Sequence, residues 1–557
     1  MAEQLRRIGE PVVGAPPGGV RIRTRLHLTE DEAAALGEVG EFLGSVYRRE
    51  LAHRISMGHL DRRAHAVWRA ERKQAVTAVA SSRWAGAITR AAEDQYQLGM
   101  RALTAQIADL RAAIAVLEHR CGLRPGETSA PAQDAGGGPR RQPRRSLRGY
   151  ASAAQRFSKT RRMTTLRARL AEADSMLAAG RPSITVGGNR LWRTRHNLAA
   201  AEMTEQQWRG RWDAARMFLT ADGETGKAGG NETIRVDTRG QLRIKVPVAL
   251  ADRFGAHLLI TAAVVFNHRS DEWGDRVRDR RAVRYDITFD PRRGRWYLDA
   301  SWRITPAPIG EFDDLRDGHV LGVDLNADHL AICVLDASGN PVGSPVTIEI
   351  ATAGLPASRR DGRVRAAITT LLDLAVHHGC TAVVVENLDF ADARCTGRET
   401  LGRGRRGKRL RRTVAGIPTA KFRCRLTSMA ARRSVAVIGV DPAYTSMWGR
   451  QHWLKPLQQQ TSDPATVTEH HGAAAAIGRR GLGKPIRRRP AGPRTQQRMR
   501  VGTPPARPDQ PPGATRRCRS SGSPPRPPRR RGMPVHQRTP TVSGQHRSGR
   551  TGLSPAH

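Results

Sequence analysis

Two carboxylates lie inside otherwise apolar segments of the chain. Asp324 follows the run from Val320 to Val323, and Glu386 ends the run that starts at Thr381. Each run has the length and composition of a buried strand. A charged side chain in such a strand is costly unless it is paired or binds a metal ion, so we interpret Asp324 as part of a site. The alternative for Asp324 is a structural role, in which it caps the adjacent turn.

The segment between the two carboxylates indicates how they meet. Residues 330–335 and 346–350 predict two further strands, and residues 364–378 predict a helix. If the strand that ends at Glu386 lies parallel to the strand of Asp324, the two carboxylates are neighbours, and they repel each other unless cations lie between them. Their hard oxygen ligands suit Mg²⁺ or Mn²⁺. Two such ions, about 3.5–4 Å apart, can activate a water and stabilise the leaving 3′-oxygen in phosphodiester hydrolysis.

The net charge indicates a polyanionic partner. The 557 residues include 94 Lys and Arg against 51 Asp and Glu, which gives a formal charge of +43. Binding to phosphates relieves this self-repulsion and releases counterions, so we predict nucleic-acid binding. The alternative is an ordinary protein with a basic disordered tail, although the excess also runs through the body of the chain.

One basic cluster follows the second carboxylate and is predicted to border the site. Seven of the eleven residues from Gly402 to Arg412 are cations. Phosphate contact is the functional interpretation, and a solvated loop is the alternative. Two arginines near the end of the same domain extend the predicted surface. The candidate nucleic-acid-binding residues are Arg403, Arg405, Arg406, Lys408, Arg409, Arg411, Arg412, Arg479 and Arg480.

The cysteines and the hydropathy pattern exclude several classes of protein. The six cysteines form no CxxC pair, which argues against a disulfide framework and a cysteine-rich zinc site. The longest apolar run, residues 258–266, has the length of a strand and not of a membrane span. No apolar signal-peptide core follows Met1. These features predict a soluble protein of a reducing cytoplasm.

The elements before the site predict a barrel with a helical insertion. Residues 20–28 alternate as in a strand, and Thr29 is a candidate N-cap of a helical pattern that continues to about residue 120. Apolar stripes at 103–117 and 166–177 predict an antiparallel helical hairpin. Residues 182–305 alternate again, and we predict a small β-barrel that the strand at 20–28 completes.

The elements around and after the site predict a different architecture. Strands and helices alternate from residue 316 onward, which is typical of an α/β domain. The tail at 491–557 is rich in Arg, Pro and Gly and is predicted to be disordered. It is either a weak nucleic-acid-binding extension or an out-of-frame extension without a selected role. The predicted fold class is multidomain α+β.

Four blocks of the chain resemble the TnpB family, which bacterial insertion sequences encode and which is related to type V CRISPR effectors. The blocks are GVDLN at 322–326, VVVENLDF at 383–390, the basic stretch that ends in KFR at 421–423, and VDPAYTS at 440–446. The resemblance spans roughly residues 20–485. It implies a wedge-like β-barrel split over 1–29 and 180–310, a helical recognition insertion over 30–179, and an RNase H-like, RuvC-type nuclease domain over 316–490 with a basic helical insert at 391–433.

The resemblance also implies an activity and its partners. It implies RNA-guided, Mg²⁺- or Mn²⁺-dependent DNA cleavage, with Asp324 and Glu386 as catalytic metal ligands and with guide RNA and target DNA as partners. A transposase of the same element is a candidate further partner. The implied location is the bacterial cytoplasm, close to the nucleoid, and no membrane is involved.

The chain departs from the family pattern at two points. The family's four-cysteine zinc ribbon has no counterpart at 447–453, so we predict no zinc, with Trp448 and Trp453 as a hydrophobic substitute. The family's third acid, an aspartate that opens the last helix, corresponds to His471, and Glu469 is the alternative. Histidine can ligate a metal ion or orient the attacking water. If neither residue serves, the protein is a nuclease-dead nucleic-acid binder.

A third hypothesis is an actin-like or sugar-kinase-like ATPase. Those folds also begin with a strand, an Asp and a hairpin, but they place Gly, Thr or Ser after the Asp to hold phosphate. Here Leu325 to Asp328 replace those residues, and the sequence contains no second phosphate loop. We therefore favour a nuclease.

Overall fold

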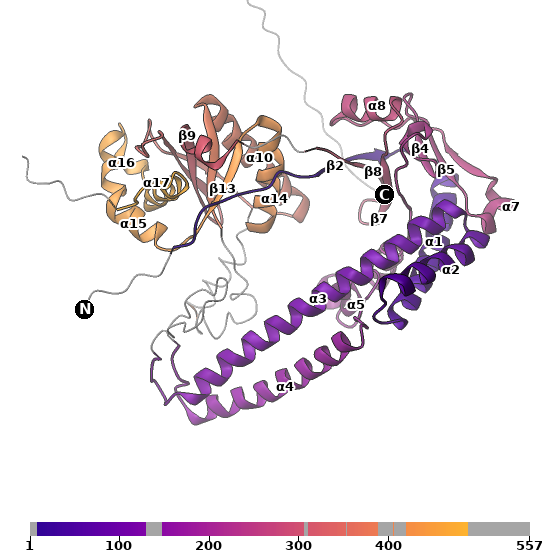
Figure 1. Ribbon diagram of the computed structural model, residues 1–557, viewed down its shortest axis with the longest axis horizontal. Helices are drawn as coiled ribbons and strands as arrows, with labels where there is room; N and C mark the ends of the chain where they lie inside the picture. The colour runs from indigo at the N-terminus through magenta and orange to yellow at the C-terminus, as the bar shows by residue number, and fades with distance from the viewer. Residues whose placement is uncertain are drawn as a thin grey trace, which may run out of the picture. The chain divides into compact units, whose positions relative to one another are not determined.

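The computed structural model describes residues 8–129, 147–305, 310–352, 354–387, 405 and 419–487. The predicted tail and most of the predicted basic insert lie outside these residues. The described elements form a multidomain α+β protein, as the sequence predicted (Figure 1). Of the helices in these ranges, none combines the length and the apolar character that a membrane crossing requires.

Four long helices follow the strand β2 (Gly19–Leu26). Thr29 caps the first helix in a reciprocal capping box with Glu32, which confirms the predicted N-cap. The last two helices pack through their buried apolar stripes, so the predicted hairpin is confirmed as well. The helices are α1 (Glu30–Ser56), α2 (Arg62–Val79), α3 (Ser82–Gly122) and α4 (Ala153–Ala178).

The predicted barrel is wrong. The strands described in this region form two separate sheets, one of four strands in the order β2-β8-β7-β3 and one of three in the order β4-β5-β6. β2 does pair with β8 along its whole length, so the predicted return of the chain to its first long strand is confirmed. The strands are β3 (Thr220–Ala221), β4 (Ile234–Val236), β5 (Leu242–Lys245), β6 (His257–Ile260), β7 (Arg284–Asp290) and β8 (Arg295–Arg303).

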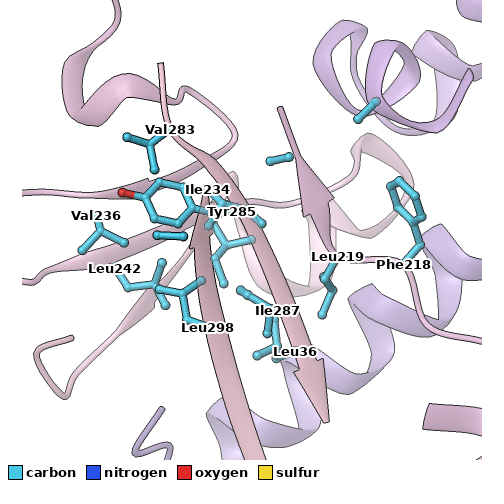
Figure 2. Packing of buried hydrophobic residues seen from close by; sticks show 14 of the residues in the cluster. Leu36, Phe218, Leu219, Ile234, Val236, Leu242, Val283, Tyr285, Ile287 and Leu298 are labelled. Atoms are coloured by element: carbon cyan, nitrogen blue, oxygen red, sulfur yellow. The ribbon is translucent and has the colours of Figure 1, made fainter. Parts of the chain in front are cut away.

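The two sheets need no closure because helices cover their apolar faces. Tyr285 and Leu298 of the four-stranded sheet share one core with Leu242 of the three-stranded sheet and with Leu36 of α1. Figure 2 shows Leu36 next to Ile287 in this cluster. Burial against other elements removes the same apolar area from water that closure into a barrel would remove.

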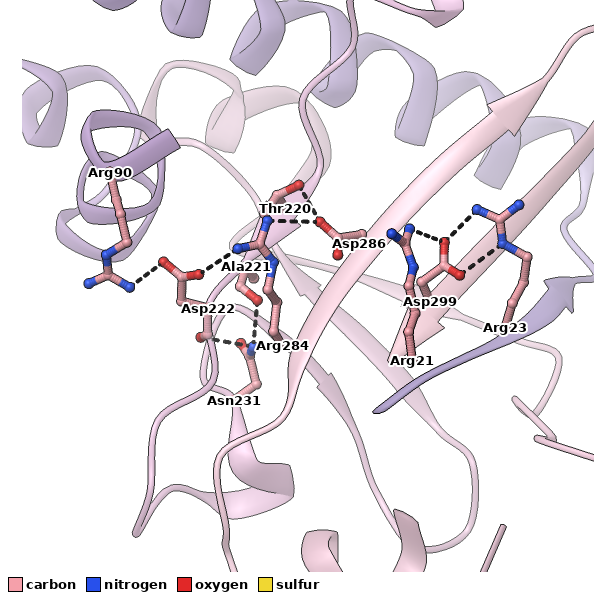
Figure 3. Close-up of polar contacts among 10 residues, drawn as sticks. All are labelled: Arg21, Arg23, Arg90, Thr220, Ala221, Asp222, Asn231, Arg284, Asp286 and Asp299. Carbon is pink, nitrogen blue, oxygen red and sulfur yellow. Dashed lines mark hydrogen bonds and ion pairs between the residues drawn. The ribbon is translucent and has the colours of Figure 1, made fainter. Parts of the chain in front are cut away.

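A buried carboxylate fastens β2 to β8 on the opposite face of the sheet. Asp299 is 1% exposed and accepts hydrogen bonds of 2.7–2.8 Å from Arg21 and Arg23 (Figure 3). Burial opposes its charge, but the two guanidiniums outweigh burial and hold the pKa of Asp299 below its ordinary value. This contact joins strands that are separated by the whole helical segment.

Six strands form the third sheet, in the order β1-β13-β12-β9-β10-β11. Strand β10 pairs antiparallel with both of its neighbours, β9 and β11, whereas β12 lies parallel to β9 and to β13. This confirms the predicted parallel pairing of the strands that carry Asp324 and Glu386. The strands are β1 (Val12–Val13), which the sequence did not predict, β9 (His319–Leu325), β10 (His329–Leu335), β11 (Val346–Glu349), β12 (Cys380–Glu386) and β13 (Ala436–Val440).

Helices cover both faces of this sheet. One core contains side chains of α10 (Ala357–His377) and α14 (Thr419–Ala430). The other contains α15 (Thr445–His452), α16 (Leu454–Gln460) and α17 (Glu469–Gly481), together with the buried Trp448 and Trp453. The remaining short helices are α5 (Asn189–Thr194), η1 (Ala199–Ala201), α6 (Glu205–Ala214), η2 (Ala228–Gly230), η3 (Val248–Leu250), α7 (Ala251–Phe254), α8 (Ser270–Arg278), α9 (Phe312–Arg316), η4 (Ala431–Arg433) and η5 (Pro464–Thr466).

Helix α17 lies unusually close to β9 because both contribute glycines at the crossing. A Cβ at Gly322 would stand 2.2 Å from the carbonyl oxygen of Ala474 and 2.9 Å from the nitrogen of Gly478. Only a residue without a side chain fits there. Successive residues of a strand point to opposite faces, so Asp324 lies on the same face as Gly322 and is directed toward α17.

This contact yields the first prediction. Gly322→Ala forces backbone of α17 away from the sheet, and we expect the free energy of unfolding of this domain to fall by about 3 kcal/mol. Gly362→Ala is the matched control, because a Cβ at Gly362 in α10 meets nothing within 4 Å. The control should be neutral or slightly stabilising, as in other helix interiors. Calorimetric unfolding of both variants measures the difference, and equal stability would contradict the close-packing interpretation.

Candidate active site

The sheet brings the two predicted carboxylates together. Strands β9 and β12 pair Val323 with Val385, so the next residues, Asp324 and Glu386, occupy neighbouring positions at the same ends of two parallel strands. Asp324 is 7% exposed, and Glu386 is partly buried. Both are directed toward the face that α15 and α17 cover. The predicted proximity of the two residues is confirmed, and their role as metal ligands stays a prediction.

Glu386 holds a proton more tightly than an ordinary glutamate. Burial raises its pKa from 4.5 to about 7, the charge of Asp324 adds to the rise, and a hydrogen bond with Thr445 opposes it. The Thr445 hydroxyl contacts both Glu386 Oε1 and the carbonyl oxygen of Pro442. A hydroxyl has one proton, so it donates to only one of these oxygens at a time. When it donates to Pro442, a protonated Glu386 donates to the hydroxyl oxygen.

Asp324 is held by two donors. Its Oδ2 lies 3.1 Å from the side-chain nitrogen of Asn326 and 2.9 Å from Nδ1 of His470. Asn326 belongs to the turn between β9 and β10, and His470 belongs to the first turn of α17. The hydrogen bond with Asp324 raises the pKa of His470 above its ordinary value, so the ring and the carboxylate stabilise each other as an ion pair.

The histidine of α17 that contacts Asp324 is His470 and not the predicted His471. His471 is 2% exposed, and its Nδ1 accepts a 3.0 Å hydrogen bond from the backbone nitrogen of Thr468. Its Nε2 lies 3.0 Å from the hydroxyl of Thr347. Because Nδ1 accepts, the ring proton is on Nε2 and both nitrogens have protein partners. Burial lowers the pKa of His471, so this ring is a neutral cap of α17.

The spacing of small residues in α17 contains the signal that the sequence interpretation missed. Ala474 and Gly478 contact β9, and Gly481 contacts β12. His470 lies four residues before Ala474 and therefore on the same side of the helix, which faces the sheet. The alternative third residue, Glu469, is mostly exposed and lies 3.7 Å from Arg450, so its carboxylate is engaged at the surface.

Arg480 does not have the predicted surface position. Its side chain is 6% exposed, and it donates hydrogen bonds to the carbonyl oxygens of Asp441 and Ala443. It therefore holds the loop that carries Thr445. Arg479 donates to the carbonyl oxygens of Gly339 and Pro485.

The remaining predicted basic residues can be placed only in part. Arg405 is exposed. The candidates outside the described residues are Arg403, Arg406, Lys408, Arg409, Arg411 and Arg412.

The side chains present fit a divalent cation at the two carboxylates. Neighbouring carboxylate oxygens suit Mg²⁺ or Mn²⁺, whereas imidazole prefers softer metals. Burial, and to a smaller extent the charge of Asp324, raises the pKa of Glu386, and a bound cation would offset both effects. In the described ranges, no three His, Cys, Asp or Glu side chains form a ready metal-binding group. Asp324 and Glu386 would therefore hold the cation, with His470 beside them.

Comparisons with known proteins give a limited result. No protein-family model and no curated protein matches the chain. Among solved structures, the chain is similar to RuvC of T. thermophilus in complex with a Holliday junction substrate. The identity is 18%, the match covers 29% of this chain and 91% of the RuvC chain, and the TM-score is 0.21. At this TM-score the likeness supports no argument about activity, and the site rests on its own geometry.

The pKa of Glu386 yields the second prediction. An acid whose pKa is raised by folding destabilises the folded state as pH rises from its unfolded pKa toward its folded pKa, here from 4.5 to about 7. Glu386→Gln removes this effect. In the presence of a chelator we expect this variant to be more stable than wild type at pH 8, by at most about 3 kcal/mol. The gap should close as pH falls to 4.5. Thermal unfolding across this range measures it, and a gap independent of pH would contradict the assignment.

The two histidines yield the third prediction. His471→Ala removes a buried helix cap and leaves Thr468 and Thr347 without their partner, so we expect a loss of about 2–4 kcal/mol in unfolding free energy. His470→Ala removes a partly exposed ion pair, so the loss should be at most about 1 kcal/mol. Denaturant unfolding of both variants gives the comparison. Equal losses would mean that the two rings do not differ in role.

Proposed function

We propose that this chain is a metal-dependent nuclease whose site consists of Asp324, Glu386 and His470. More specifically, we propose an RNA-guided DNA endonuclease of the TnpB type. The observation that carries the proposal is the pair of carboxylates at the same ends of two adjacent parallel strands. Burial, together with the charge of Asp324, raises the pKa of Glu386, and such perturbed carboxylates are typical of functional sites.

Each residue of the proposed site has a separate role in binding the cation. A bound divalent cation would supply an activated water and stabilisation of the leaving 3′-oxygen. Asp324 and Glu386 would hold it, and Glu386 must first lose a proton that it retains up to about pH 7. His470 keeps a proton directed at Asp324 and fixes the orientation of that carboxylate. Thr445 holds Oε1 of Glu386 and limits its rotation.

The finer parts of the proposal rest on other observations. The net charge of +43 supports a nucleic-acid partner. The TnpB resemblance of the blocks around Asp324, Glu386 and Thr445 supports a guide RNA and a DNA target. In such proteins base pairing reads the target sequence, and the protein reads backbone shape and a short flanking motif.

One observation favours a second candidate function. The third position of the site holds a histidine where a carboxylate would bind Mg²⁺ more strongly, and the described part of the chain contains no group of three metal-binding side chains. A chain with a weakened metal site that still binds guide RNA and DNA would act as a regulator or as a transposition accessory protein.

Cleavage by purified protein gives the fourth prediction. The protein is produced together with the non-coding RNA encoded beside its gene, and target DNA is offered with Mg²⁺ or Mn²⁺. We expect cleavage by wild type, and a loss of about a hundredfold or more in Asp324→Ala and Glu386→Gln, because each removes a cation ligand. Asp313→Ala is the matched control, since Asp313 is an exposed acid of the same domain.

Three outcomes of this experiment decide between the candidates. Equal cleavage by wild type and Asp324→Ala would show that the activity does not use this site. Guide-dependent DNA binding without cleavage in any variant would favour the nuclease-dead alternative. Cleavage that is lost in both site variants and kept in Asp313→Ala supports the proposed function.

A further inference from the structure

A chain of hydrogen bonds leads away from Asp324 into the turn between β9 and β10. The side-chain nitrogen of Asn326 lies 3.1 Å from Asp324 Oδ2 and 3.2 Å from Nε2 of His329. Nδ1 of His329 lies 2.7 Å from Oδ1 of Asp328. The backbone closes the same turn, because the nitrogen of Asn326 donates to the carbonyl oxygen of His329 at 3.0 Å.

The direction of each hydrogen bond follows from the two carboxylates. The carboxylate of Asp328 only accepts, so Nδ1 of His329 donates to it, and this bond holds the pKa of Asp328 below its ordinary value. The carboxylate of Asp324 also only accepts, so Asn326 must present its amide nitrogen there. The second proton of that nitrogen then points to Nε2 of His329, which accepts it when the ring carries its proton on Nδ1.

This arrangement determines which oxygen of Asp324 is engaged. Both the Asn326 and the His470 hydrogen bonds end on Oδ2, and they reach it from different elements, the turn and α17. The rings of His329 and His470 also contact each other edge to face, with centroids 5.1 Å apart. Two donors on one oxygen fix the rotation of the carboxylate, so Oδ1 keeps a defined direction.

We propose that Asp328, His329 and Asn326 form a positioning relay that sets the orientation of Asp324 and thereby the affinity of the site for a divalent cation. The inference rests on the proposed function, since it assigns the relay to the same metal site. None of the three is a catalytic residue in this proposal. Each acts through Asp324, as outer residues of other metal sites act through the ligands that they orient.

A purely structural role in the turn is the competing explanation. The turn is already closed by the backbone hydrogen bond between Asn326 and His329. In this explanation, the polar side chains of the turn contribute only to solubility or to local stability. That role predicts changes in unfolding temperature and no change in metal affinity, whereas the relay predicts the opposite, so the two explanations give separate measurable results.

The experiment measures Mn²⁺ binding to the full chain by electron paramagnetic resonance, without nucleic acid. We expect Asn326→Ala and His329→Leu to weaken Mn²⁺ binding about 10- to 100-fold. His329→Gln is the rescue variant, because its amide oxygen can accept the Asn326 hydrogen bond, and it should stay within about threefold of wild type. Unfolding temperatures in chelator should differ little among the three variants.

Several results would overturn the relay. Wild-type Mn²⁺ affinity in Asn326→Ala would contradict the relay. An equal loss of Mn²⁺ affinity in His329→Gln and His329→Leu would show that the hydrogen bond between Asn326 and His329 does not influence metal binding. A loss in His329→Leu with none in Asn326→Ala would make His329 a direct ligand. Absence of Mn²⁺ binding by wild type would also reject the relay.

The same protein preparation separates this inference from the proposed function. If wild type binds Mn²⁺ and the variants lose it, but guide-dependent cleavage is absent, the relay stands and the nuclease proposal fails. If wild type cleaves and the relay variants bind Mn²⁺ and cleave as wild type does, the nuclease proposal stands and the relay fails.

Discussion

The burial of two neighbouring carboxylates, Asp324 and Glu386, is the constraint on which this domain depends. Parallel pairing of β9 and β12 places them at adjacent positions on the same face of the sheet. Each neighbouring element supplies one compensation: α15 brings the Thr445 hydroxyl to Glu386, and α17 brings His470 to Asp324. The amino-terminal end of α17 carries the positive end of the helix dipole toward the same pair. The remaining cost, mainly of burial and to a smaller extent of the Asp324 charge, appears as the raised pKa of Glu386.

These compensations require close helix packing. α17 reaches Asp324 only because Gly322 and Gly478 let helix and strand backbones touch. α15 in turn crosses α17 at Gly449 and Gly472, where a Cβ on either residue would stand 2.5–2.7 Å from the other helix's backbone. The positions of Thr445 and His470 are therefore set by glycines that never contact the site, since larger side chains would push both helices away from the strand ends.

The sequence predicted the placement of the two carboxylates better than that of their surroundings, for separable physical reasons. The positions of Asp324 and Glu386 on adjacent strands could be predicted because an acid near the end of a buried strand is visible in one short segment. The choice between His470 and His471 depends on helix phase, which the Thr468 cap sets through its bond with His471. Arg480 was predicted at the surface but is buried, because the residue type alone does not show which side of a helix an arginine occupies. The barrel prediction failed because closure depends on which helices cover the sheets, and alternation along a strand does not encode that.

A histidine in the third position changes the balance of charge at the centre. A third carboxylate would add to the repulsion and raise the pKa values of the cluster further. Here His470 pairs with Asp324, and Glu386 retains a proton up to about pH 7, so the centre holds less uncompensated negative charge than three carboxylates would. A cation that binds there must displace the Glu386 proton, and its affinity then rises with pH through the neutral range. Metal binding is thus conditional on loss of the Glu386 proton, which burial and the charge of Asp324 retain up to about pH 7. A third carboxylate would raise this pKa further, whereas a histidine at that position adds no negative charge.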